Sequence, residues 1–167
     1  TVDLYQLCGE ICERLQQRAQ AKGVTLTLSG QSAQVNTVRQ IADEVIYNLC
    51  DNAIKYNRPD GSVTVTVSTE AGSIKVWVQD TGIGISPADQ RRVFERFYRV
   101  DKSHSRQIGG TGLGLSIVKH GAAYLGVKVG LHSQVGQGST FWLEWSAQPL
   151  MQQESPMQKR LETAQNL

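Results

Sequence analysis

This sequence has little of the features that mark specialised classes of protein. Its 167 residues include 3 cysteines and 4 prolines, and aromatic residues make up 7% of the chain. No apolar run approaches the roughly 18 residues that a membrane-spanning helix requires. Hydrophobic residues at 40% and charged residues at 19% are typical of a globular protein, and the length suits one domain with a sizeable core. A membrane-spanning chain, a disordered chain and two full domains are therefore excluded.

The sequence also lacks a large excess of charge of either sign. The formal net charge is +2, whereas proteins that bind nucleic acids or membrane surfaces usually carry a strong basic face. We therefore expect no nucleic-acid partner and no direct membrane contact.

The cysteines are odd in number and come without a secretory leader, which argues against a disulfide scaffold and for a reducing compartment. Cys8 and Cys12 lie one helical turn apart, so a two-ligand metal clip is conceivable, but isolated cysteines usually behave as small core residues. The first residues, from Thr1 to Leu4, show no targeting pattern and read like the interior of a longer protein. We expect these cysteines in the core and a further segment upstream.

Hydrophobic periodicity predicts a chain in which helices alternate with strand hairpins. The predicted helices cover Asp3 to Lys22, Ile41 to Ala53, Pro87 to Tyr98 and Leu113 to Leu125. The predicted strands cover Val24 to Gly30, Val63 to Val67, Ile74 to Val78, Val127 to Leu131 and Phe141 to Trp145. This order predicts an α+β fold, a two-layer α/β sandwich in which a mixed, mostly antiparallel sheet carries the helices on one face. The irregular stretch from Val100 to Gly112 is predicted to be a mobile loop.

A strip of polar residues follows one side of the second predicted helix. Glu44, Asn48 and Asn52 lie four residues apart, so each is rotated only about 40° from the one before. Lys55 and Tyr56 extend the strip. Carboxylate and amide oxygens can hold a hard cation, and an ammonium group can neutralise its phosphate. The alternative is the solvated face of an ordinary helix.

Two glycine-rich turns offer backbone that a ligand can approach closely. Asp80-Thr81-Gly82-Ile83-Gly84-Ile85 follows a predicted strand, and its carboxylate can accept from an amino group, although a plain turn is the alternative. Gly109 to Ser116 (GGTGLGLS) precedes a helix whose first N–H groups can bind phosphate. A Rossmann motif is disfavoured because no strand directly precedes these glycines, and a P-loop is excluded because no Gly-Lys-Ser/Thr follows.

Positive charge gathers between these two turns. A polyphosphate ligand would explain the local excess of four positive charges, and a solvated surface is the alternative. Phe94, Phe97 and Tyr98 lie among these charges and are interpreted as packing residues. The charged residues are Arg91, Arg92, Arg96, Arg99, Lys102 and Arg106, against Glu95 and Asp101.

Together, the four clusters resemble the ATP-binding catalytic domain of sensor histidine kinases, within the wider group of gyrase, heat-shock chaperone and MutL ATPases. The matching motifs are EVIYNLCDNAIKY from Glu44, DTGIGI from Asp80, FERFYRVD from Phe94 and GGTGLGLSIV from Gly109. The resemblance covers residues 1–147, which we interpret as the catalytic domain, and leaves 148–167 as a polar tail. It implies a Bergerat-type ATP-binding fold and γ-phosphoryl transfer from ATP to a histidine.

The resemblance also implies a role for each site residue. Asp80 would accept from the adenine amino group with support from Thr140. Asn48 and Asn52 would ligate Mg²⁺, and Lys55 and Arg99 would neutralise phosphate charge, with Asn48, Lys55 and Arg99 as the catalytic set. The remaining contacts would come from Tyr56, Ile85 and Leu115 at the base, from Gly82 and Gly84 in the first glycine turn, and from Gly110, Thr111, Gly112, Leu113 and Gly114 in a lid over the triphosphate.

The family's phosphoacceptor motif, a histidine followed by an acidic residue, is missing here. His104, His120 and His132 are followed by serine or glycine. The resemblance therefore implies that the acceptor lies on a separate dimerisation domain of the same kinase, with a response regulator as an indirect partner. This fragment would be monomeric, the whole protein a homodimer, and the domain cytoplasmic, as part of a membrane-bound sensor.

Two other functions are considered. An ATP-driven clamp of the gyrase or chaperone kind would need a carboxylate where Asn48 stands, because an amide cannot act as a general base toward water. A module that binds ATP without transferring phosphate is the second alternative, and the intact motifs disfavour it.

Overall fold

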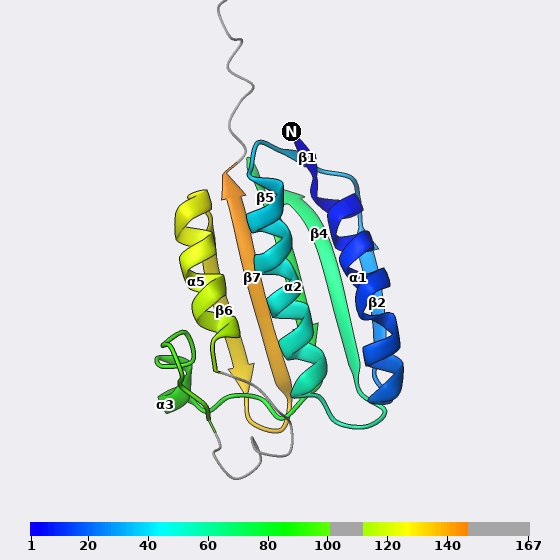
Figure 1. Cartoon of the computed structure of the whole chain (residues 1–167), viewed down its shortest axis with the longest axis vertical. Helices are drawn as coiled ribbons and strands as arrows, with labels where there is room; N and C mark the ends of the chain where they lie inside the picture. The colour runs from blue at the N-terminus through cyan, green and yellow to red at the C-terminus, as the bar shows by residue number, and fades with distance from the viewer. Residues whose placement is uncertain (101–111, 147–167) are drawn as a thin grey trace, which may run out of the picture.

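The computed structural model describes residues 1–100 and 112–146, and in this part of the chain three helices cover one face of a five-stranded sheet (Figure 1). The strands lie in the order β2-β4-β5-β7-β6. The covering helices are α1 (Leu4–Ala21), α2 (Arg39–Lys55) and α5 (Gly114–Leu125). The strands of the sheet are β2 (Thr25–Gly30), β4 (Ser62–Glu70), β5 (Ser73–Asp80), β6 (Lys128–Gln134) and β7 (Gly138–Ser146). The predicted two-layer α+β sandwich is confirmed.

The pairing of the strands follows from how they are connected. β4 and β5 form one antiparallel hairpin, and β6 and β7 form the other, as predicted. β2 and β4 are parallel because α2 lies between them in sequence and returns the chain to the same end of the sheet. The antiparallel pairing of β5 with β7 then joins the two hairpins. Two very short strands that the sequence did not predict, β1 (Val2–Asp3) and β3 (Gln34–Val35), form a separate pair near the start of α1.

Local signals fix where two of the helices begin or end. The Asp3 carboxylate caps α1 by accepting from the N–H groups of Tyr5 and Gln6 at 2.9 and 3.1 Å. Gly126 ends α5 with φ of +68°, a left-handed conformation that glycine adopts without steric cost.

One helix is shorter than the sequence predicted. The helix expected from Pro87 to Tyr98 is α3 (Pro87–Gln90), and residues 91–97 form turns. Within this turn region Phe97 has φ of +62°, which a continuing right-handed helix does not allow. The predicted mobile loop lies almost wholly outside the described residues, as does the predicted tail.

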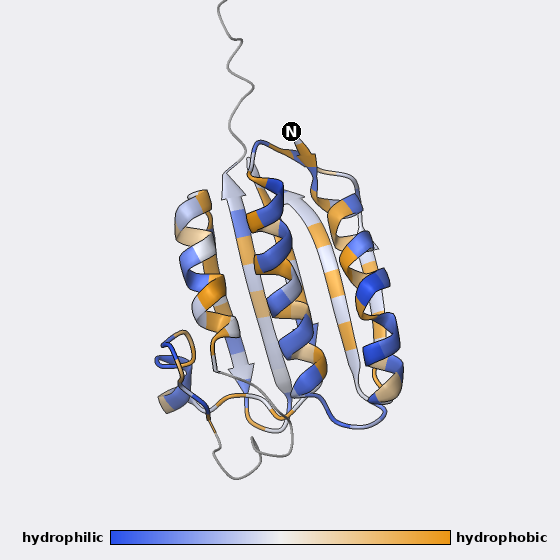
Figure 2. Ribbon diagram, in the orientation of Figure 1, coloured by the Kyte–Doolittle hydropathy of each residue, from blue (hydrophilic) through white to orange (hydrophobic). Residues whose placement is uncertain are grey.

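The core lies between the sheet and the three helices. Val63, Val65 and Val67 alternate along β4 and are buried, as are Val76 and Val78 on β5, and all face the helices. The buried residues of the helices are mostly apolar, and Figure 2 shows hydrophilic residues along the outer side of α1 and α2. Period two in the strands and period 3.6 in the helices therefore meet in one apolar layer.

The cysteines belong to this core, as the sequence indicated. Cys8, Cys12 and Cys50 are buried free thiols in the apolar cluster shared by α1 and α2. Burial raises the pKa of the Cys12 thiol to about 11 and holds those of Cys8 and Cys50 well above the usual range. Within residues 1–100 and 112–146, no helix is both long and apolar enough to cross a membrane.

We predict that Leu143→Ala lowers the free energy of unfolding by about 2–5 kcal/mol, because Leu143 is fully buried on β7 and its truncation leaves a cavity. Urea denaturation measures this change. Glu144→Gln on the opposite face of the same strand is the matched control. Its ion pairs with Lys75 and Lys128 are 3.8 and 4.0 Å long, so the control is expected to change stability by less than about 0.5 kcal/mol. Equal losses in the two variants would contradict the assignment of the core face.

Candidate nucleotide-binding site

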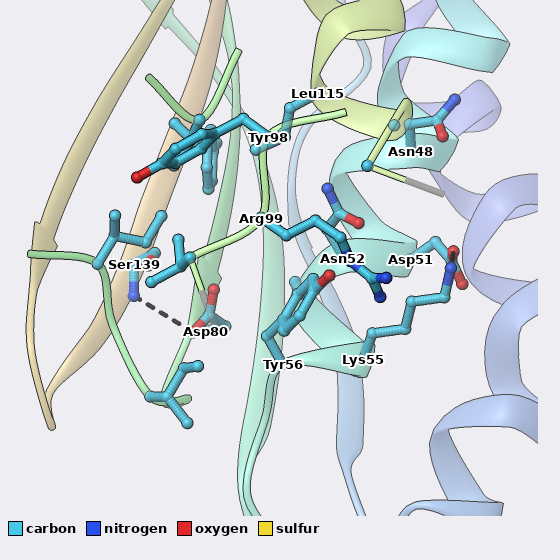
Figure 3. Close-up of a pocket in the computed structure, with 18 of the residues that line it drawn as sticks. Asn48, Asp51, Asn52, Lys55, Tyr56, Asp80, Tyr98, Arg99, Leu115 and Ser139 are labelled. Carbon is cyan, nitrogen blue, oxygen red and sulfur yellow. Dashed lines mark hydrogen bonds and ion pairs between the residues drawn. The ribbon is translucent and has the colours of Figure 1, made fainter. Parts of the chain in front are cut away.

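The end of α2, the start of α5, the end of β5 and the start of β7 lie at the same end of the molecule (Figure 1). Residues from these elements line a cavity of about 290 Å³ (Figure 3). All four sequence motifs contribute to it, although they are spread over some seventy residues of the chain. The lining residues are Asn48, Asp51, Asn52, Ala53, Lys55 and Tyr56; Asp80, Ile83, Gly84 and Ile85; Val93, Tyr98, Arg99 and Val100; Gly112, Leu113, Gly114, Leu115 and Ile117; and Ser139 and Phe141.

Asp80 is the carboxylate at one end of the cavity, and the backbone holds it in place. Its Oδ1 atom accepts from the N–H of Gly82 at 2.8 Å and from the N–H of Ser139 at 3.2 Å (Figure 3). Neither bond uses Oδ2, which is left to accept from a ligand. Burial raises the pKa of the Asp80 carboxyl above its usual value, and the two backbone hydrogen bonds counter only part of that rise.

The turn after Asp80 needs its two glycines for steric reasons. A Cβ on Gly82 would lie 2.3 Å from the carbonyl oxygen of Tyr56. Gly84 has φ of +70°, and a Cβ there would lie 2.1 Å from the carbonyl oxygen of Gln134. The turn is thus packed against the end of α2 on one side and the β6–β7 turn on the other, which fixes the Asp80 end of the cavity.

The walls near Asp80 are mainly apolar. Ile85 and Leu115 line the cavity together with Tyr56. Phe141 forms part of the wall and packs edge-to-face on Phe94, with ring centroids 6.1 Å apart. This end can therefore enclose the apolar faces of a flat ring that carries a polar group on its edge, with that group directed toward Asp80.

The opposite end of the cavity carries two amides. Asn48 and Asn52 project from successive turns of α2 toward the first residue of α5 (Figure 3). A Cβ built on Gly114 would lie 3.4 Å from Oδ1 of Asn48 and 3.5 Å from Oδ1 of Asn52, so both amides lie beside this glycine. The Asn48 amide nitrogen donates to the carbonyl oxygen of Glu44 at 2.8 Å, which leaves its Oδ1 for other partners. Amide oxygens are suitable ligands for a hard cation.

Two cationic side chains belong to the cavity wall, Lys55 and Arg99. Lys55 forms an ion pair of 2.9 Å with Asp51, which also pairs with Arg18 of α1. Arg99 reaches the cavity from the FERFYRVD motif, and Figure 3 shows it beside Asn52. Amides and cations, with Asp51 paired to Lys55, lie at one end, and Asp80 lies at the other, so the cavity has two chemically different ends.

The structure brings most of the predicted site residues to this single cavity. Gly82 packs against Tyr56 and is not among the lining residues, and Gly110 and Thr111 lie outside the described residues. The residues that line the cavity are Asn48, Asn52, Lys55, Tyr56, Asp80, Gly84, Ile85, Arg99, Gly112, Leu113, Gly114 and Leu115.

The role predicted for Thr140 is corrected by the structure, because the hydrogen bond that supports Asp80 comes from Ser139. Thr140 pairs with Gln79 on β5 and His132 on β6, and its side chain points to the face of the sheet away from the helices. Ser139, one residue earlier, points to the helix side and supplies the N–H that binds Asp80. Successive strand residues alternate faces, so an error of one residue reverses the side.

We predicted a packing role for all three rings of the FERFYRVD motif, and the structure shows that the three rings differ. Phe94 packs on Phe141, and the Tyr98 hydroxyl donates to the Asp89 carboxylate. Phe97 is 68% exposed. Its left-handed backbone, whose N–H donates to the carbonyl oxygen of Gly112 at 3.0 Å, turns the ring outward.

Sequence reasoning missed three residues that hold the site together. Asp51 and Ser139 contact predicted site residues, and Arg58 donates to the carbonyl oxygens of Thr81 and Gly136 at 2.5 and 3.1 Å, tying together the two turns. Asp51 had a signal, since an acid four residues before Lys55 on a helix favours an ion pair. Ser139 and Arg58 act through partners distant in sequence and had none.

A family model matches most of the chain. Residues 37–149 match the family described as histidine kinase-, DNA gyrase B-, and HSP90-like ATPase, which is more than half of the chain. The chain belongs to this ATPase family. The match includes all four motifs that line the cavity.

Individual relatives narrow the family to one branch. The chain is 42% identical over 147 residues to the sensor-like histidine kinase SenX3 of Mycolicibacterium smegmatis, a match that covers 85% of this chain and 37% of SenX3. The mycobacterial sensor histidine kinase MprB has a solved structure with a TM-score of 0.75 and 25% identity, over 89% of this chain and 97% of that one. Full-length ShkA, solved in complex with AMPPNP, has a TM-score of 0.73 and 31% identity, over 87% of this chain and 30% of ShkA. This protein is therefore an ATP-binding catalytic domain of the histidine kinase type.

We predict that the free energy of unfolding of Asp80→Asn increases relative to that of the wild type as pH rises from about 3 to about 7. The pKa of Asp80 is raised in the folded state, so the folded protein holds this proton more tightly than the unfolded chain and loses stability as pH rises through that window. An asparagine carries no such penalty. Thermal melts of both proteins across the range measure the difference in Tm.

Asp89→Asn is the matched control with the opposite sign. Hydrogen bonds from Ser86 and Tyr98 lower the pKa of the Asp89 carboxyl, so its ionised form stabilises the fold above its usual pKa. This variant is expected to lose stability relative to the wild type over the same rise in pH. The same trend in both variants would contradict the conclusion that burial raises the pKa of Asp80.

Proposed function

We propose that this chain binds Mg·ATP in the described cavity and transfers the γ-phosphoryl group to a histidine on a separate dimerisation domain of the same kinase. The observation that carries the proposal is the arrangement of Asp80, whose Oδ1 is held by two backbone N–H groups while Oδ2 is left at the apolar end of the cavity. An adenine amino group is a donor that fits this acceptor, and the apolar walls suit the purine ring.

The other end of the cavity suits a triphosphate. Lys55 and Arg99 supply positive charge there. Helix α5 begins at Gly114, where no side chain in the described part of the chain caps its first turn, so its first N–H groups point toward the same region. In this proposal Gly82 and Gly84 shape the turn at the base, and Gly110, Thr111, Gly112 and Leu113 belong to the segment over the phosphates.

The amides fit the magnesium ion that the family's chemistry implies. Asn48 and Asn52 would hold it, because the oxygens of both amides lie beside Gly114 at the phosphate end of the cavity. When bound, Mg²⁺ would neutralise phosphate charge and orient the phosphoryl groups. Among the described residues no group of three or more His, Cys, Asp or Glu side chains forms a metal cage, and Mg²⁺ commonly takes few protein ligands alongside phosphate oxygens and water.

The nature of residue 48 favours transfer over hydrolysis. Asn48 stands where an ATP-driven clamp would need a carboxylate, and an amide cannot take a proton from water at neutral pH. Glu44, one turn earlier, lines a separate groove between α2 and α5. We therefore propose a kinase that holds its ATP until an imidazole arrives, not a clamp ATPase.

The partners and setting of the domain are also part of the proposal. His120 is exposed on α5 and His132 lies on β6, and neither is followed by an acidic residue. His104 lies outside the described residues. The chain spans 37% of SenX3, which is consistent with an acceptor supplied by another part of a longer protein. A response regulator would then receive the phosphoryl group, within a homodimeric, cytoplasmic kinase portion whose catalytic domain is 1–147 and whose tail is 148–167.

We predict that Asp80→Asn weakens binding of ATP and ADP by about 1–3 kcal/mol, the usual cost of leaving a buried polar partner poorly matched. The amide that replaces the carboxylate loses the charge-assisted bond to the adenine amino group. Isothermal calorimetry at fixed salt measures the two affinities. Glu144→Gln, which changes a carboxylate on the opposite face of β7 that does not line the cavity, is the control and should bind normally. Unchanged affinity in the Asp80 variant would rule out this carboxylate as the adenine acceptor.

We also predict that the chain alone does not label itself with γ-phosphate but phosphorylates a separately supplied helical hairpin that carries the acceptor histidine. Positioning and charge supplied by the cavity would act on an imidazole that this chain does not present in the family's motif. Radiolabel transfer with and without the hairpin tests this, and a hairpin with His replaced by Gln is the control. Label on His104 in the chain alone would overturn the prediction.

A further inference from the structure

Helices α1 and α2 run in the same direction and are joined by a row of polar contacts. The contributing residues lie four apart from Glu10 to Lys22, and four or eight apart from Arg39 to Lys55, so the row stays on one side of each helix. The contacts are Glu10 with Arg39, Arg14 with Asp43 at 2.7 Å, Arg18 with Asp51, and the Lys22 ammonium donating to the carbonyl oxygen of Lys55 at 2.8 Å. The row therefore begins at the far end of the helices and ends at the cavity.

The cluster nearest the cavity contains one carboxylate and two cations. Asp51 directs Oδ1 to Arg18 and Oδ2 to Lys55, the latter at 2.9 Å. Its side chain is only 10% exposed, whereas that of Arg18 is 50% exposed. Figure 3 shows Lys55 extended toward Asp51 and away from Asn52. Lys55 is thus held on the α1 side of the cavity by a buried carboxylate that it shares with α1.

A phosphate at this end of the cavity would compete with Asp51 for the Lys55 ammonium. A carboxylate paired with one cation attracts it more strongly than a carboxylate whose charge is shared by two. We propose that Asp51 is a positioning residue that retains Lys55, and that Arg18, by sharing the Asp51 carboxylate, sets how readily Lys55 is released to the phosphates of a bound nucleotide. This inference rests on the proposed function, and it makes helix α1 a determinant of phosphate affinity without touching the nucleotide.

The inference assigns opposite signs to two substitutions. Asp51→Asn removes the retaining charge, so the affinity for ATP should rise by about three- to tenfold. Arg18→Gln leaves Lys55 as the only cation on Asp51, so ATP affinity should fall by about threefold. Arg18→Lys keeps a cation on the carboxylate and should restore most of the wild-type affinity. Adenosine, which has no phosphate, should bind all of these variants equally well.

The experiment measures ATP and adenosine affinities by calorimetry for the full chain at fixed ionic strength. Arg14→Gln and Asp43→Asn are the matched controls. This pair joins the same two helices about one turn earlier on α1 and two turns earlier on α2, and its substitutions change net charge equally without touching a partner of Lys55. The two key substitutions are repeated in a Lys55→Met background, where both effects should fall to the level of the controls. Thermal melts confirm that each variant is folded.

Opposite shifts in ATP affinity that disappear without Lys55 would support the inference. Two outcomes would overturn the inference by showing a general charge effect: shifts of the same size in the controls, and shifts that persist with Lys55→Met. A loss of adenosine binding would overturn it by showing a structural effect. If the wild-type chain binds neither ATP nor adenosine, the proposed function itself fails. If the wild-type chain binds ATP but Asp51→Asn does not change its affinity, only this inference fails.

Discussion

The antiparallel pairing of β5 with β7 is the constraint on which the site depends. This pairing joins the two hairpins into one sheet and sets Gln79 opposite Thr140, which brings the N–H of Ser139 within reach of Asp80. Gly138 permits the approach, because a Cβ there would lie 2.0 Å from the carbonyl oxygen of Asp80. A shift of this register by one residue would remove the Ser139 N–H from Asp80, and it would also turn the apolar face of β7 away from the core.

Helix α2 carries the second half of the site and the centre of the core on one element. Ile46 and Leu49 are buried against the sheet, while Asn48 and Asn52 project from the adjacent side into the cavity. The amides are therefore held by the packing of the core, as precise placement of ligand groups requires. Helix α5 completes this end because its first residue, Gly114, packs directly on both amides.

The two carboxylates of the cavity are satisfied in different ways, and this sets what each can do. Asp80 is held by backbone N–H groups, and burial raises its pKa, so its charge costs stability while one oxygen is kept for a ligand. Asp51 is balanced by Arg18 and Lys55, so its charge is compensated within the protein. The first arrangement suits recognition of a base, and the second controls a cation near phosphate.

The sequence by itself determined the elements and the chemistry of the site. Periodicity located the helices and hairpins of the sandwich, and the four motifs identified Asn48, Asn52, Lys55 and Asp80, because local spacing governs both. Tertiary structure decided what depends on distant partners. It assigned the Asp80 contact to Ser139 instead of Thr140, ended α3 at Gln90, and joined Lys55 through Asp51 to a helix that begins thirty-five residues before α2. Strand register and helix pairing arise from packing between segments far apart in the chain, and no local pattern encodes them.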